Sequence, residues 1–256
     1  MYYNRIKDRE PIPKQHPDPE PLYEVKMNYE IRYEPFPVLM VNLEDGEQIQ
    51  CQAGAMSWMT PNMEMQTSTG GGLGKLFSRV ISGENAFVNK YAAHGKGMIA
   101  FSSDFVGQIL AVEIKPGQDF VVQQSGYLAS FGNVEQTVFF QKRLGAAFFG
   151  GEGFIMQRFS GSGIVFVEID GYCQEYTLAA GQQMVLSTGY LAAMDATCKM
   201  DVQSVKGAMN MLFGSESFFN TIVTGPGKIY VQTKPISKVA QALKPYFPQP
   251  TSSSNN

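Results

Sequence analysis

The chain has 256 residues, of which 44% are hydrophobic and 17% charged, and its formal net charge is −3. This length fits one large all-β domain or two domains of average size, and the apolar share is sufficient for a sizeable core. The mildly acidic balance, with no long block of like charges, excludes the broad basic surface of a protein that binds nucleic acid.

The first 28 residues are predicted to form an extended arm. They are polar and rich in proline, which fixes φ and removes a backbone donor, so regular structure is not expected there. The arm lacks the apolar core of a secretory signal, and its acidic residues and prolines argue against a transit peptide.

The sequence favours a soluble protein of the cytoplasm. The most apolar run, 144–156, is too short to cross a bilayer and contains Glu152. Peripheral association with a membrane is an open alternative that no feature of the sequence supports. Three cysteines stand far apart in apolar, strand-like segments, which predicts reduced and mostly buried thiols: Cys51, Cys173 and Cys198.

Segment 29–233 is predicted to be one body of three hairpin-rich repeats, over about 38–103, 107–169 and 172–233. Each repeat opens with an alternating strand, a turn ending in glycine, a Glu or Gln, and a second alternating strand. Alternation with period two around a turn glycine is typical of a β-hairpin. The turn glycines are Gly46, Gly117 and Gly181. Inward positions are predicted at Leu43, Ile114 and Leu178, and at Val41, Val112 and Tyr176.

The second half of each repeat has a short apolar stretch of helical character, a glutamate, a phenylalanine, a Gly-x-Gly turn and a further strand. The pair Asp170-Gly171 is a type I′ hairpin signal between the second and third repeats. Units of this kind bury their apolar faces on one another. The expected fold is therefore all-β, a β-sandwich or β-prism-like body with approximate three-fold internal symmetry and short helices between strands.

The last segment, 234–256, is predicted to contain a short helix and a disordered tail. The stretch ISKVAQAL has the pattern for two helical turns before a proline, and the following residues are polar and of low complexity.

The glycine-rich stretch TSTGGGLGKLF is predicted to be scaffold and not a phosphate-binding loop. A Walker A loop needs glycine, four residues, and then Gly-Lys followed by Ser or Thr. Here the residue at the first glycine position is Thr69, and Lys75 is followed by Leu76.

Three glutamates at equivalent places in the repeats are the most suggestive polar positions: Glu84, Glu152 and Glu216. They could form a ring of carboxylates that binds a cation, or each could accept backbone N–H bonds at a turn, and their glycine and serine neighbours favour the second role. With two histidines and no Cys-x-x-Cys pair, a zinc site is not expected. His94 is interpreted as a solvent-facing turn residue. Trp58 is predicted either to fill an irregular pocket or to lie at an oligomer interface.

Several motifs, in order, resemble those of a family of bacterial and archaeal proteins of unknown function, whose fungal member is altered inheritance rate of mitochondria protein twenty-four. They are CQAGAMSWM, the glycine run after it, GENAFVNKY, GEGFIMQRFSGSGIVFV and GYLAAMD. The resemblance implies an all-β fold like that of the tryptophan RNA-binding attenuation protein, a short relative of the double-stranded β-helix. It also implies homo-oligomers, with trimers favoured, and it provides no enzymatic activity, cofactor or catalytic residue. The fungal member's link to the mitochondrial inner membrane transfers poorly to a chain without a transit peptide, and shared fold alone does not imply RNA binding.

The leading hypothesis is a non-enzymatic, homo-oligomeric scaffold or interaction protein of the cytoplasm, since self-association is one way to cover exposed strand edges. The alternative is a small-molecule or ion-binding module that uses a cavity between repeats near Glu84, Glu152 and Glu216. No cofactor and no nucleic-acid partner are expected.

Overall fold

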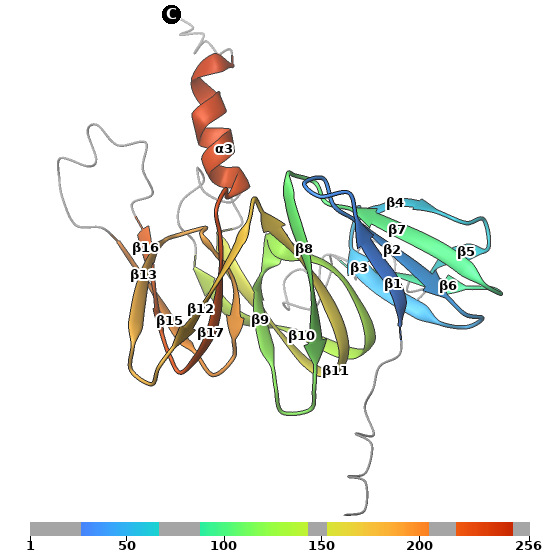
Figure 1. The fold of residues 1–256 in the computed structure, drawn as a ribbon, viewed down its shortest axis with the longest axis horizontal. Coiled ribbons are helices and arrows are strands. Elements are labelled where there is room, and N and C mark those ends of the chain that lie inside the picture. The colour runs from blue at the N-terminus through green and yellow to red at the C-terminus, as the bar shows by residue number, and fades with distance from the viewer. Residues whose placement is uncertain (1–26, 67–87, 143–152, 205–218, 248–256) are drawn as a thin grey trace, which may run out of the picture.

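A computed structural model describes residues 27–66, 88–142, 153–204 and 219–247. Within these ranges the chain is mostly β-strand, which confirms the all-β class (Figure 1). The first third of the chain contains β1 (Asn28–Arg32), β2 (Val38–Leu43), β3 (Gln48–Gln52), β4 (Met56–Met59), β5 (Met63–Gln66), β6 (Val88–Ala93) and β7 (Gly97–Ser102).

The middle third has fewer and longer strands, and the last third again has short ones. The middle third contains β8 (Gly107–Ile114), β9 (Phe120–Gln123), the 3-10 turn η1 (Gln124–Gly126), β10 (Tyr127–Lys142) and β11 (Phe154–Asp170). The last third contains β12 (Cys173–Leu178), β13 (Gln183–Ser187), β14 (Leu191–Asp195), β15 (Lys199–Ser204), β16 (Phe219–Thr224), β17 (Gly227–Gln232), α3 (Ile236–Leu243) and η3 (Lys244–Tyr246).

Over the described ranges, the strands form three open sheets. A four-stranded sheet has the order β1-β2-β7-β4, and a three-stranded sheet has the order β13-β16-β15. The largest sheet has ten strands in the order β12-β17-β14-β9-β11-β10-β3-β6-β5, with β8 paired to β11. This sheet links all three thirds of the chain, which follow one another along the long axis in Figure 1.

The same antiparallel pairings occur in each third. The opening strand pairs with the closing strand in β2–β7, β8–β11 and β12–β17. The closing strand also pairs with β4, β10 and β14 respectively, and each of these ladders has an irregularity after its first residue pair. The turn glycines Gly46, Gly117 and Gly181 all have φ between 77° and 80°, the left-handed conformation that the turn pattern predicts.

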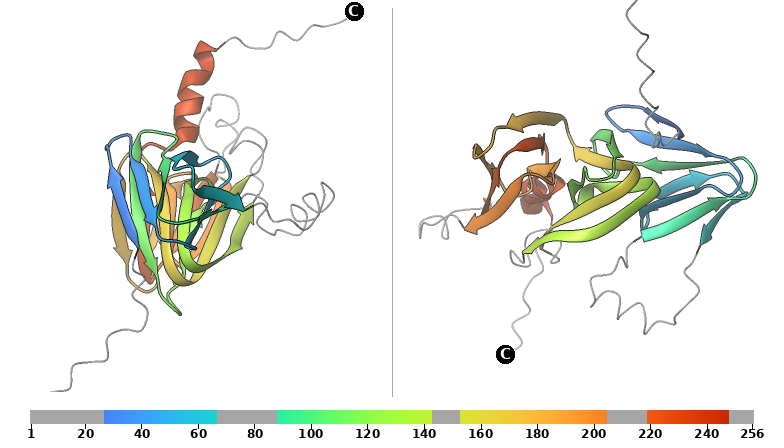
Figure 2. Two further views of the ribbon diagram at one scale, coloured as in Figure 1. Left: turned by 90° about the vertical axis from the view of Figure 1, so that its right-hand side faces the viewer. Right: turned by 90° about the horizontal axis from the view of Figure 1, so that it is seen from below.

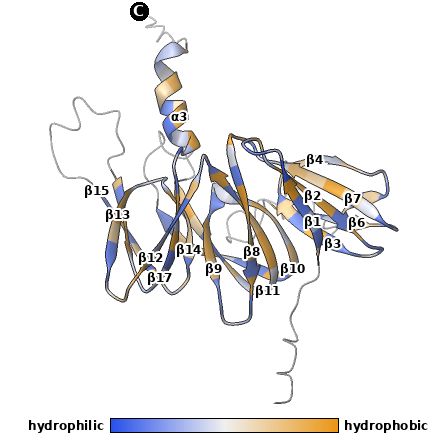
Figure 3. Ribbon diagram, in the orientation of Figure 1, coloured by the Kyte–Doolittle hydropathy of each residue, from blue (hydrophilic) through white to orange (hydrophobic). Residues whose placement is uncertain are grey.

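The core consists of three clusters of buried side chains, and each contains residues from more than one third of the chain. Alternating apolar and polar residues along the strands place one face of each inner strand in this core (Figure 3). Leu43, Ile114 and Leu178 are buried, as predicted. Tyr176, predicted to face inward, is instead 42% exposed, because no described element covers this part of β12, in which only Leu178 is buried.

The turn at Asp170-Gly171 is not a hairpin. Gly171 has the expected positive φ, but β11 pairs with β8, β9 and β10, whereas β12 pairs with β17. The turn is held by residues from other connections: Gly171 N–H donates to Val106 O at 2.9 Å, and Lys234 N–H donates to Asp170 O at 3.0 Å. It therefore passes the chain from one third to the next.

Helix α3 covers the segment for which two helical turns were predicted. Its first N–H, on Ile236, donates to the Asp170 carboxylate at 2.7 Å, and the helix then leads away from the sheets (Figure 2). Among the described helices, none is both long and apolar enough to cross a membrane. The predicted arm, inter-strand helices and tail fall mainly in 1–26, 67–87, 143–152, 205–218 and 248–256, outside the described residues.

Candidate functional site

The three glutamates singled out by the sequence, Glu84, Glu152 and Glu216, lie outside the described residues. Within the described part of the chain, no group of three or more His, Cys, Asp or Glu side chains is placed to hold a metal ion. The polar clusters and strand edges that the structure does describe are therefore considered one by one.

A partly buried carboxylate, Glu168, lies where the connections between the thirds meet. Burial raises its pKa to about 7, and the nearby charges of Asp104 and Asp170 add to this shift, while hydrogen bonds from the Ser103 side chain and the Asp104 backbone oppose it. The Asp104 N–H donates to Glu168 Oε1 at 3.1 Å. Both bonds attach the connection between β7 and β8 to β11, so the cluster is structural. The sequence contained one signal for it, an acidic residue in each short segment between the predicted repeats, Asp104 and Asp170.

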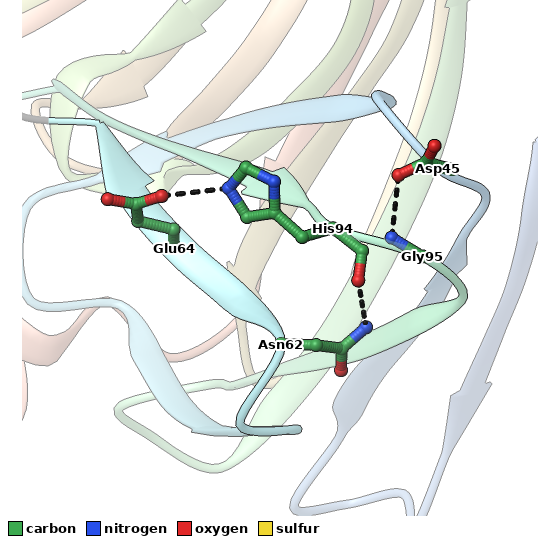
Figure 4. Close-up of polar contacts among 5 residues, drawn as sticks. All are labelled: Asp45, Asn62, Glu64, His94 and Gly95. Atoms are coloured by element: carbon green, nitrogen blue, oxygen red, sulfur yellow. Dashed lines mark hydrogen bonds and ion pairs between the residues drawn. The ribbon is translucent and has the colours of Figure 1, made fainter.

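A second polar cluster surrounds the turn between β6 and β7 (Figure 4). His94 Nε2 lies 2.8 Å from Glu64 Oε2, and both side chains are exposed. Asp45 Oδ1 accepts a hydrogen bond from Gly95 N–H at 2.6 Å, and Asn62 Nδ2 donates to His94 O at 3.0 Å. The cluster therefore joins three neighbouring turns, and His94 faces solvent as the sequence indicated.

The cysteines are free thiols: Cys51 and Cys198 are buried, and Cys173 is partly buried. Burial raises the pKa of the Cys51 thiol to about 12 and also raises the pKa of the other two. Because the thiolate is the reactive form, these side chains are poor nucleophiles at neutral pH.

The strands at the sheet edges differ in charge. Natural proteins protect exposed edges with charged side chains, which discourage pairing with another chain. In the described ranges, most edge strands follow this rule: β1 carries Glu30 and Arg32, β5 carries Glu64, β8 carries Glu113, β12 carries Glu175, and β15 carries Lys199 and Asp201. The two exceptions are β4, with the sequence MSWM, and β13, with the sequence QMVLS.

These two uncharged edges also expose large apolar side chains. Trp58 in β4 is 44% exposed and Val185 in β13 is 59% exposed. Among the described strands, β4 pairs only with β7 and β13 only with β16. They lie toward opposite ends of the long axis (Figure 1). Because Trp58 is partly exposed, it is not enclosed in a pocket. Strands β4 and β13 together form the candidate interaction site. The sequence indicated this site only at Trp58.

Within the described ranges, the fold and these strands define an all-β protein of open sheets with two uncharged edges. The chain belongs to the family described as mitochondrial biogenesis AIM24, whose model matches residues 29–234. An uncharacterised protein of Streptococcus pyogenes serotype M6 is 30% identical over 222 residues, which cover 83% of this chain and 88% of that protein.

A crystal structure of another Streptococcus pyogenes protein is similar in fold. It superposes with a TM-score of 0.73 at 23% sequence identity, over 87% of this chain and all of that one. At this identity the likeness concerns the fold alone.

Proposed function

We propose that this protein is a non-enzymatic scaffold of the cytoplasm that associates with copies of itself. The observation that carries the proposal is the pair of uncharged edge strands, β4 and β13, with Trp58 and Val185 exposed on them. An exposed, uncharged strand edge is a template for pairing with another chain. Burying the two side chains in an interface would remove apolar area from water, worth on the order of 25 cal/mol per Å² before the costs of association.

We further propose that the three thirds are repeats of one sandwich-like unit, arranged as in the predicted body. The recurrence of the pairings β2–β7, β8–β11 and β12–β17 supports this arrangement. For the assembly we propose a trimer, the size that resemblance to the family favours.

Sedimentation velocity and light scattering over a wide range of protein concentrations test the scaffold role. Association predicts a species heavier than the 28.3 kDa monomer whose share grows with concentration. Tyr176→Asp is a control for substitutions in β4 and β13. It places a carboxylate at an exposed aromatic residue on an edge strand that already carries Glu175. This variant should associate like the wild type, whereas a wild-type protein that stays monomeric throughout would contradict the proposal.

A further inference from the structure

Two joints within the chain show how neighbouring thirds connect. In the first, β3 pairs antiparallel with β10, so that Cys51 lies opposite Ala129. In the second, β9 pairs antiparallel with β14, so that Val122 lies opposite Ala193. Each joint therefore pairs the strand after the first turn glycine of one third (β3 or β9) with the strand that begins the second half of the next third (β10 or β14).

The two joints have the same register. The segments 38–59, 109–130 and 173–194 align without a gap, and this alignment matches Cys51 to Val122 and Ala129 to Ala193. The same positions thus face each other in both joints. In the first and last thirds one such pairing is missing. In the alignment β13 corresponds to β3 and β9, and β4 corresponds to the start of β10 and to β14. Among the described strands, neither β13 nor β4 has the partner that its counterparts have.

We propose that β13 of one copy pairs antiparallel with β4 of a second copy and so repeats the internal joint between molecules. The inference rests on the proposed self-association and specifies its surface. The alignment fixes the register, with three pairs facing one another: Leu186 and Trp58, Val185 and Met59, and Met184 and Thr60.

Burial at matched positions supports a second copy as the occupant. Val121, in the middle of β9, is fully buried, whereas the corresponding Val185 is 59% exposed. Ala129 and Ala193 are fully buried, whereas the corresponding Trp58 is 44% exposed. Strands of these two kinds already pair twice within the chain, so the partner that fits each end is the opposite end of the same protein.

This interface is heterologous, because the two surfaces that meet are different. Each joint leaves a free β4 on one copy and a free β13 on the other, so assembly proceeds until a ring closes or a filament forms. An isologous dimer, in which the same strand of each copy meets itself, would instead use only one of the two edges.

Two single variants and their mixture test the proposal. Trp58→Asp blocks β4 but leaves β13 intact, and Val185→Asp does the opposite. Each places a carboxylate in the joint, so each variant alone should associate at least about tenfold more weakly than the wild type. An equimolar mixture should restore association, and it should stop at a dimer because only one productive joint remains. Melting temperatures and circular dichroism establish that both variants are folded.

The outcomes separate this inference from the scaffold proposal. A monomeric wild type would overturn both. A wild-type oligomer unaffected by either substitution would overturn the joint alone, and so would a loss of association caused by only one substitution or a mixture that stays monomeric. The register has its own test: an oxidised cross-link should form between Trp58→Cys and Leu186→Cys chains far more efficiently than between Trp58→Cys and Gln183→Cys chains. Equal cross-linking would overturn the stated register.

Discussion

The middle third and the outer thirds share the same strand pairings but differ in whether the paired strands are continuous or divided into shorter strands. In the middle, β10 and β11 run unbroken for 16 and 17 residues. In the first third, β4 and β5 are separate strands, and Pro61 stands between them at the position aligned with Gly132 of β10. Proline has no N–H to donate to the ladder, whereas glycine keeps its N–H and can adopt a positive φ. In the last third Ala196 stands at this position, and β14 and β15 are also separate strands. The comparison shows that the strand continues without a break only in the third that has glycine there.

The largest expected loss of stability comes from truncating a side chain in the core around the middle strands. Phe166 of β11 is fully buried and makes an edge-to-face contact with Tyr29, at 5.0 Å between ring centroids. Phe166→Ala should reduce the free energy of unfolding by about 3–5 kcal/mol, measured by urea denaturation. Tyr176→Ala, on the exposed edge strand of the last third, should cost about 1 kcal/mol or less. Similar losses for both would contradict the burial difference between the middle and outer thirds.

Gly132→Ala tests the role of this glycine in β10 directly. Gly132 has a φ of 91°, and a Cβ atom there would lie 2.8 Å from Ser162 O and 2.9 Å from Gly163 Cα. The strained backbone and the close contact together should cost about 2–4 kcal/mol in the free energy of unfolding. Gly46→Ala is the control, since its φ is 80° but no atom lies within 4 Å of the added methyl group. It should cost only about 1 kcal/mol, and an equal loss would show that crowding in β10 is unimportant.

Matched valines compare an internal strand with an end strand. Val121→Ala should destabilise the monomer by about 2 kcal/mol, because this side chain is fully buried in the core cluster that also contains Met156 and Leu191. Val185→Ala should change monomer stability by less than about 0.5 kcal/mol. Both are measured by chemical denaturation at concentrations below association. A large effect of Val185→Ala under those conditions would mean that β13 is covered within a single chain.

The smallest expected effect on stability depends on pH and comes from the titration of Glu168, beside the connections between the thirds. The pKa of Glu168 is raised from 4.5 to about 7, so the folded protein holds a proton that the unfolded chain releases in this interval. Its contribution to stability is therefore complete below about pH 4.5 and declines as the pH rises to about 7. Glu168→Gln keeps an acceptor for the Asp104 N–H but removes the titration.

Denaturation of both proteins at about pH 5 and about pH 8 measures this effect. The stability of Glu168→Gln relative to the wild type should rise by about 1–2 kcal/mol between the two values, less than the full 1.4 kcal/mol per pKa unit because Glu168 is not completely shielded. A difference that does not change with pH would show that Glu168 titrates normally.

The sequence predicted the features that depend on local pattern. The turn glycines, the inward positions Leu43, Ile114 and Leu178, and helix α3 follow from period-two alternation, positive-φ turns and helix periodicity. These signals involve residues close together in the chain, so a single sequence displays them directly.

The features that the sequence missed depend on distant neighbours. Tyr176 fits an inward pattern, but whether a sheet covers that position is decided by strands far along the chain. Asp170-Gly171 has the residues of a hairpin turn, yet β11 already has its partners, so the turn serves as a crossover. The uncharged edges could be recognised only once the strand order showed which strands end each sheet.

The attachment of α3 gives the molecule a convenient position for a spectroscopic label. The helix begins beside the end of β11, because the Ile236 N–H donates a hydrogen bond to the Asp170 carboxylate. Its axis points away from the sheets (Figure 1). A dye at Ala242, on an exposed part of this helix, would leave both end strands unmodified. Energy transfer between such dyes could then report the spacing and number of protomers without disturbing the contacts that hold them together.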